Sequence, residues 1–239
     1  MNCVIIHGCP DDAETAKDPT RRTYDKHWIP WIRRELEKRK ISVEVPLMPT
    51  PWDVDYSQWK KSFEKIQVND KTILIGHSCG SAFLVRWLGE TKRKAYKLIL
   101  VAPWKIPYGE GEFLEKKKQF YDYEIDQSIR NRVKEVIIFT SDNEKDEGKE
   151  SAAIFHKSLG GTVINLNGRG HYLMRDMKTE EFPELLEVAL RLKQLILAQS
   201  IRNGRKSGKR RRCSRLRLIL KNPSFFLLLL ILTFLEVCT

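Results

Sequence analysis

The chain has 239 residues, of which 41% are hydrophobic and 10% aromatic, and this composition excludes an intrinsically disordered protein. The formal net charge is +12, but residues 201–239 carry +9 of it, which leaves +3 for residues 1–200. The basic character therefore belongs to the C-terminal segment, and it gives no reason to expect that the folded part binds nucleic acid.

Short apolar runs alternate with helical patterns along residues 1–198. The pattern predicts strands at 4–7, 41–45, 71–75, 98–102, 133–140 and 162–166. It predicts helices at 25–40, 56–66, 81–89, 148–159 and 182–197. Continuous apolar strands separated by helices indicate the α/β class, with a mainly parallel sheet covered by helices on both faces. Residues 104–124 have no clear pattern, and we expect a lid or an insertion there.

The domain organisation follows from a change of composition after Ser200. We expect one domain over residues 1–200, a basic and disordered linker over 201–224, and a short apolar tail over 225–239. The run FFLLLLILTFL at 225–235 is shorter than the ~20 residues of a membrane-spanning helix. Three alternatives stay open for this region: a membrane association through residues 216–236, a segment that lies on a membrane surface, or a non-functional extension of the reading frame.

The five cysteines are odd in number, form no C-x-x-C pair and match no zinc or disulfide framework; they are Cys3, Cys9, Cys79, Cys213 and Cys238. Residues 1–7 lack the basic stretch and the long apolar run of a secretory signal. Both observations favour a reducing compartment and a cytoplasmic protein.

The motif Gly76-His77-Ser78-Cys79-Gly80 fits the pattern G-x-S-x-G. It lies between the predicted strand 71–75 and the predicted helix 81–89, which is the setting that a nucleophile elbow requires. Side chains at positions 76 and 80 would collide with the neighbouring strand and helix, so the two glycines let the tight turn close. Ser78 is therefore the candidate nucleophile.

A serine hydroxyl needs a base, and two histidines follow Ser78 in the chain. His156 lies inside the predicted helix 148–159, where a surface or packing role is expected. His171 lies in a glycine-rich loop, residues 167–172, directly after the last predicted strand. That position brings it to the carboxyl edge of the sheet beside the elbow, so we assign the base to His171.

The acid of the triad must follow a strand that lies between the nucleophile and the base. Asp142 is the first acidic residue after the strand at 133–140, and we assign the acid to it. Close competitors lie further into the same loop, namely Glu144, Asp146 and Glu147.

An oxyanion hole requires two backbone N–H donors. We expect one from Cys79, the residue after the nucleophile, and the other from Cys9 in the loop after the first strand. His7, in the same loop, is expected to shape the loop rather than to act as a base. Trp52 and Trp104 follow strand-end loops on the same side and are candidates for an apolar acyl pocket, with core or lid packing as the alternative.

These motifs, together with Ile5-Ile6-His7-Gly8, Ser141-Asp142-Asn143 and Gly168-Arg169-Gly170-His171-Tyr172, resemble the compact serine hydrolases of the YdeN-like and retinoblastoma-binding-protein-nine-like family. The resemblance covers about residues 1–195 and implies a compact α/β-hydrolase. It places the family's triad on Ser78, Asp142 and His171. The chain has no Leu-x-Cys-x-Glu motif, so a retinoblastoma protein is not carried over as a partner.

The expected function is a carboxylesterase-like serine hydrolase that acts on an ester, a thioester or an activated amide of a small acyl-bearing substrate, with no metal or cofactor. The alternative is a binding protein on a hydrolase scaffold with little or no turnover. For the C-terminal tail, the partner to consider is an anionic membrane surface.

Overall fold

The computed structural model describes residues 1–10 and 12–191, and the predicted linker and apolar tail lie outside this range. The six strands form one sheet in the order β2-β1-β3-β4-β5-β6, and every pairing is parallel. Their bounds are β1 Asn2–Ile6, β2 Ser42–Glu44, β3 Thr72–His77, β4 Ala95–Val101, β5 Val133–Ser141 and β6 Thr162–Leu166. The prediction of a parallel sheet is confirmed.

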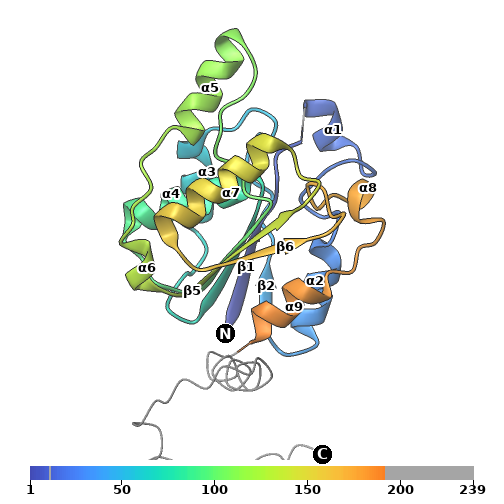
Figure 1. Cartoon of the computed structure of the whole chain (residues 1–239), viewed down its shortest axis with the longest axis vertical. Coiled ribbons are helices and arrows are strands. Elements are labelled where there is room, and N and C mark those ends of the chain that lie inside the picture. The colour runs from blue at the N-terminus through green and yellow to red at the C-terminus, as the bar shows by residue number, and fades with distance from the viewer. Residues whose placement is uncertain (11, 192–239) are drawn as a thin grey trace, which may run out of the picture. The chain divides into compact units, whose positions relative to one another are not determined.

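Helices cover both faces of this sheet (Figure 1). Their bounds are α1 Ala13–Lys17, α2 Ile29–Glu37, α3 Tyr56–Phe63, α4 Cys79–Thr91, α5 Gly111–Tyr121, α6 Ile129–Arg132, α7 Asp146–Leu159, α8 Met174–Met177 and α9 Pro183–Leu190. One apolar cluster lies between the sheet and α3, α4 and α7, and a second lies between the sheet and α2 and α9. The central strands are buried on both faces, which explains their uninterrupted apolar runs.

The segment 104–124 differs from its expected irregular form, because it contains the helix α5. Its Glu, Leu, Lys and Gln residues have high helix propensity, which outweighs a weak apolar periodicity. The buried side chains of Phe120 and Tyr121 attach its C-terminal end to the core, while the rest projects from the domain (Figure 1). An ion pair of 3.2 Å between Lys116 and Asp53 connects α5 to the loop after β2.

The register of the sheet decides which loops meet. Ile6 pairs with Gly76, His77 with Val101, and Val101 with Phe139, so β1, β3, β4 and β5 end side by side. Ser141 pairs with Leu166 at the end of β5 and β6. The loops that carry the predicted nucleophile, acid, base and oxyanion donors therefore leave the same edge of the sheet.

The predicted closing helix, 182–197, begins as α9, and its last predicted residues lie outside the described part of the chain. Within residues 1–10 and 12–191 no helix combines the length and the apolar character that crossing a membrane requires.

Candidate active site

Ser78 occupies a strained turn between β3 and α4. Its backbone has φ 52° and ψ −121°, a conformation that non-glycine residues rarely adopt. A Cβ atom on Gly76 would lie 2.6 Å from the Cα of Ser81, and one on Gly80 would lie 2.4 Å from the carbonyl oxygen of Ile6. Both contacts are sterically forbidden, so the role of these glycines in closing the elbow follows from the packing.

Two backbone hydrogen bonds fix the elbow to the end of β4. The Ser78 N–H donates to the carbonyl oxygen of Val101 over 3.0 Å, and the Trp104 N–H donates to the carbonyl oxygen of Ser78 over 3.2 Å. The strain at Ser78 is thus maintained by the surrounding structure, and the side chain stays partly exposed to solvent.

His171 lies beside Ser78, as the sequence predicts. Its Nε2 atom is 2.9 Å from the Ser78 Oγ, which is hydrogen-bond distance for a nucleophile and its base. The backbone of His171 is held on both sides: its N–H donates to Asp176 over 3.1 Å, and its carbonyl accepts from the Nε2 of His77 over 2.9 Å. Burial lowers the pKa of His77 well below its ordinary value, which keeps that side chain a neutral donor.

The carboxylate that contacts His171 belongs to Glu144. Its Oε2 atom is 2.7 Å from the Nδ1 of His171, and the Glu144 side chain is only 1% exposed. The other oxygen, Oε1, accepts the N–H of Lys145 over 2.8 Å. A carboxylate at Nδ1 places the proton on that nitrogen, which leaves Nε2 free to accept the Ser78 hydroxyl proton.

Gly148 of α7 makes room for this acid. A Cβ atom at position 148 would lie 2.7 Å from the Cγ of Glu144 and 2.8 Å from its Cδ. The packing at this glycine explains how the Glu144 side chain fits there, but a single glycine in a helix does not distinguish this acid from its competitors in the sequence.

The assignment of the acid to Asp142 is therefore corrected. The Asp142 N–H donates to the carbonyl oxygen of Leu166 over 3.2 Å, so this residue still follows the register of β5 and β6. Its exposed carboxylate accepts the N–H of Gly168 over 2.7 Å, and this hydrogen bond lowers the pKa of Asp142. The Glu144 N–H donates to the carbonyl oxygen of Ser141 over 3.2 Å and closes a turn. This turn brings Glu144, and not Asp142, to His171.

Asp142 nevertheless belongs to a cradle for the loop that carries His171. Three consecutive side chains, Ser141, Asp142 and Asn143, accept hydrogen bonds from three consecutive backbone N–H groups, those of residues 168–170, over 2.7–2.9 Å. The tripeptide after β5 therefore fixes the loop after β6, and with it the position of His171. The motif Ser141-Asp142-Asn143 therefore indicates this contact between two loops, and not the carboxylate that meets His171.

The candidate oxyanion donors are Cys9, in the loop after β1, and Cys79, in the elbow itself, and a disulfide bond joins these two residues. Cys79 is the first residue of α4, where an N–H has no acceptor within the helix. Neither N–H of this pair donates to an acceptor within residues 1–10 and 12–191. A Cβ atom on Gly8 would lie 3.3 Å from the Cβ of Ser78, so the loop after β1 runs close to Ser78.

The disulfide corrects the expectation that the cysteines form no such framework. The two residues are 70 positions apart, and no local spacing indicates the pairing. They meet because β1 and β3 are neighbours in the sheet and both end at this edge. Cys3, in β1, is buried with a free thiol.

His7 shapes the loop after β1, as expected. It is fully buried, its Nδ1 donates to the carbonyl oxygen of Gly8 over 2.7 Å, and its Nε2 accepts the N–H of Met48 over 3.1 Å. Burial lowers the pKa of His7 to about 4, so it stays neutral at physiological pH. No contact within the described residues joins its ring to Ser78.

Of the two pocket candidates, Trp104 lies at the site. The centroid of its ring is 5.7 Å from the centroid of the His171 ring. Its indole N–H donates to the carbonyl oxygen of Ile106 over 2.7 Å. Trp52 is half-buried in a turn after β2, and no ring contact joins it to the triad within the described residues.

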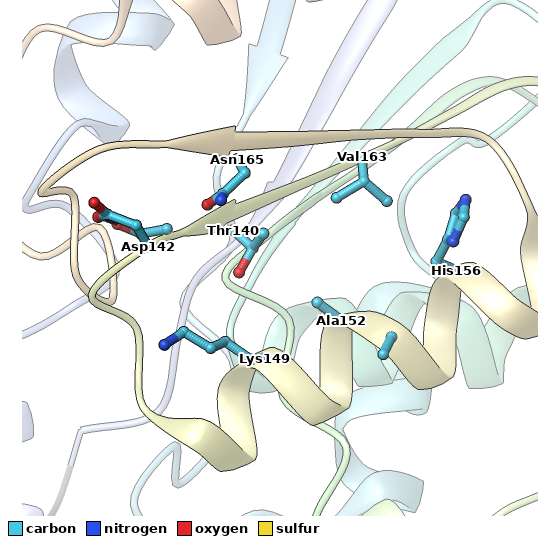
Figure 2. A pocket seen from close by; sticks show the side chains of 9 residues that line it. Thr140, Asp142, Lys149, Ala152, His156, Val163 and Asn165 are labelled. Atoms are coloured by element: carbon cyan, nitrogen blue, oxygen red, sulfur yellow. Dashed lines mark hydrogen bonds between the residues drawn. The ribbon is translucent and has the colours of Figure 1, made fainter.

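A separate hollow lies between α7 and the strands β5 and β6 (Figure 2). Its lining includes Thr140, Asp142, Lys149, His156, Val163 and Asn165, and it contains neither Ser78 nor His171. His156 thus lies on the helix surface away from the candidate active site, in agreement with the role expected for it.

Comparison with known proteins identifies the family. Residues 20–189 match the family model "Serine hydrolase". The rat protein "Serine hydrolase RBBP9" is 27% identical over 165 residues, which are 67% of this chain and 83% of that protein.

Solved structures show the same fold. The ydeN gene product of Bacillus subtilis superposes with a TM-score of 0.64 at 19% identity, over 79% of this chain and 97% of that one. Est1E from Butyrivibrio proteoclasticus gives a TM-score of 0.55 at 13% identity, over 83% of this chain and 88% of that one. With an all-parallel sheet of the α/β-hydrolase fold and a family match over most of the described domain, this chain belongs to the serine hydrolase family and resembles its YdeN-like and RBBP9-like members.

Proposed function

We propose that this protein is a carboxylesterase-like hydrolase that cleaves an ester, a thioester or an activated amide through an acyl-enzyme on Ser78. One observation carries the proposal: the Ser78 Oγ, the two nitrogens of His171 and the Glu144 carboxylate form an unbroken hydrogen-bonded chain, with contacts of 2.9 and 2.7 Å. This is the geometry of a nucleophile, a base and an orienting acid.

In the first half of the proposed reaction, His171 accepts the hydroxyl proton while the Ser78 Oγ attacks the substrate carbonyl. Glu144 holds the imidazole in the required tautomer and stabilises the imidazolium that forms. The negative charge on the carbonyl oxygen is stabilised by the N–H groups of Cys9 and Cys79. His171 then delivers its proton to the leaving group, and the acyl group stays on Ser78.

In the second half, a water molecule attacks the acyl-enzyme. His171 removes a proton from this water and returns it to Ser78, which releases a carboxylic acid. The indole of Trp104 lies beside the imidazole of His171 and supplies apolar surface for the acyl group.

Reaction with a fluorophosphonate probe tests this proposal, because such probes phosphonylate activated serines. We expect rapid labelling of the full-length protein, no labelling of Ser78→Ala, and labelling at least about 100-fold slower in His171→Ala. Ser57→Ala, on the exposed surface of α3, is the matched control and should label like the wild type.

Unchanged labelling of Ser78→Ala would exclude this serine as the nucleophile. A correctly folded protein that neither labels nor turns over a series of short and long acyl esters would favour the alternative, a binding protein on a hydrolase scaffold.

The cytoplasm is the location we propose for this reaction. Disulfides in reducing compartments are usually transient, catalytic or redox-sensing, so the bond between Cys9 and Cys79 requires an explanation there.

A further inference from the structure

The disulfide joins the two residues whose N–H groups form the proposed oxyanion hole. We propose that the Cys9–Cys79 bond positions the Cys9 donor against the elbow, and that a dithiol which reduces this bond lowers turnover. The proposal rests on the function proposed above and adds a redox dependence to it.

Cys79 provides the fixed end of this connection. It is fully buried, it begins α4, and its neighbour Gly80 packs directly against the carbonyl oxygen of Ile6. Its N–H is therefore positioned by the strand, the elbow and the helix, whatever the state of its sulfur.

Cys9 lies in a loop with fewer constraints. It is only half-buried. The peptide group before it is held at its carbonyl oxygen: the Gly8 carbonyl accepts hydrogen bonds from the Nδ1 of His7 and from the Oγ1 of Thr23, both over 2.7 Å. In a trans peptide the carbonyl and the following N–H point in opposite directions, and the described chain has no cis peptide. The two anchors therefore direct the Cys9 N–H away from themselves, but they do not set its distance from Ser78.

The disulfide supplies the missing constraint. An oxyanion donor must lie 2.7–3.1 Å from the charged oxygen, and its contribution depends on its being held there before the reaction begins. A covalent bond from the Cys9 side chain to Cys79 fixes the loop against the residue that carries the other donor. Without it, Cys9 keeps its partial packing against the apolar cluster, and the Gly8 carbonyl keeps its two hydrogen bonds.

Reduction is chemically accessible at the Cys9 sulfur, because Cys79 is buried and Cys9 is partly exposed. A thiolate of a small dithiol attacks the Cys9 sulfur, forms a mixed disulfide and releases the Cys79 thiolate, which takes up a proton. The second thiol of the reagent then displaces Cys9. Two electrons and two protons pass to the protein, which gains two thiols, and the reagent leaves as a cyclic disulfide.

The expected signature is a fall in kcat with KM nearly unchanged, because the oxyanion forms only in the transition state. Complete loss of one donor lowers kcat by about 10²–10³. A displaced but present donor should give a smaller loss, and we expect kcat to fall by about tenfold.

The experiment uses the full-length protein, purified without reductant, and an activated ester as substrate. Alkylation and mass spectrometry count the thiols before and after treatment with dithiothreitol, and circular dichroism at the assay temperature confirms that the reduced protein is folded. We expect kcat and the rate of fluorophosphonate labelling to fall on reduction and to recover on reoxidation.

Two variants assign the effect to this pair. Cys9→Ser keeps the backbone N–H but cannot form the bond, so it should show the low kcat of the reduced protein and no further response to the dithiol. The matched control replaces the other three cysteines, Cys3, Cys213 and Cys238, by serine, and it should keep the full response.

The possible outcomes separate the two proposals. Equal kcat in the verified oxidised and reduced forms, or two free thiols at Cys9 and Cys79 in the untreated protein, would overturn the redox inference while Ser78 labelling still supports the hydrolase. Absence of labelling in the oxidised form would overturn the proposed function itself.

Discussion

Replacing Glu144 by Gln tests whether Glu144, and not Asp142, is the acid that acts on His171. Glutamine has the same shape as glutamate but carries no charge, and its amide NH₂ can face the Nδ1 of His171. At that nitrogen the carboxylate lies 2.7 Å away in a buried position, with 1% of its side chain exposed. The substitution therefore removes the stabilisation of the imidazolium and the preference for the correct tautomer, with little change in packing.

The magnitude follows from the geometry. Two unit charges about 4 Å apart interact by about 4 kcal/mol at an effective dielectric constant of ~20, and each 1.36 kcal/mol corresponds to about a factor of ten in rate. The imidazolium exists only after proton transfer, so this energy is lost from the transition state. We expect kcat to fall by about 10³ in Glu144→Gln.

The assay is steady-state hydrolysis of an activated ester, with Asp142→Asn as the matched control. Asp142 is exposed and contacts the Gly168 N–H, not His171. Loss of its charge weakens one hydrogen bond of the loop cradle, so kcat should fall by about tenfold or less. If Asp142→Asn lost as much activity as Glu144→Gln, or more, the assignment of the acid to Glu144 would be refuted.

Three further outcomes are expected. Gly148→Ala puts a Cβ atom 2.7 Å from the Cγ of Glu144 and should lower kcat by about 10- to 100-fold; an unchanged kcat would contradict the role of this glycine. Because burial lowers the pKa of His7 to about 4, the unfolded chain binds a proton between pH 6.5 and 4 that the folded chain does not. The free energy of unfolding should thus fall as the pH drops through this window, by about 3 kcal/mol from His7. Urea titrations at several pH values measure this free energy. Its dependence on pH should be shallower in His7→Asn than in the wild type, and unchanged in the exposed control His156→Gln. Equal slopes in His7→Asn and the wild type would contradict the prediction. Trp104→Ala should lower kcat/KM for aromatic acyl esters more than for acetyl esters, and a uniform loss would exclude a pocket role.

The sequence by itself predicted the fold class, the turn at Ser78 and a histidine beside that turn. Apolar runs buried on both faces indicated the parallel sheet, and the strand-to-helix setting of Ser78 indicated a candidate nucleophile. These features depend on residues close together in the chain, where the period of the side chains and the steric demands of glycine act directly. His171 was predictable because a loop at the end of a parallel strand must lie at the same edge as the elbow.

Only the tertiary structure decided which acid meets His171 and which cysteines pair. Asp142 and Glu144 are two residues apart, and the choice depends on a turn onto Ser141 and on the space left by Gly148. Cys9 and Cys79 become neighbours because β1 and β3 lie side by side in the sheet. Contacts of this kind depend on the relative placement of distant segments to within an ångström or two, which local residue patterns do not encode.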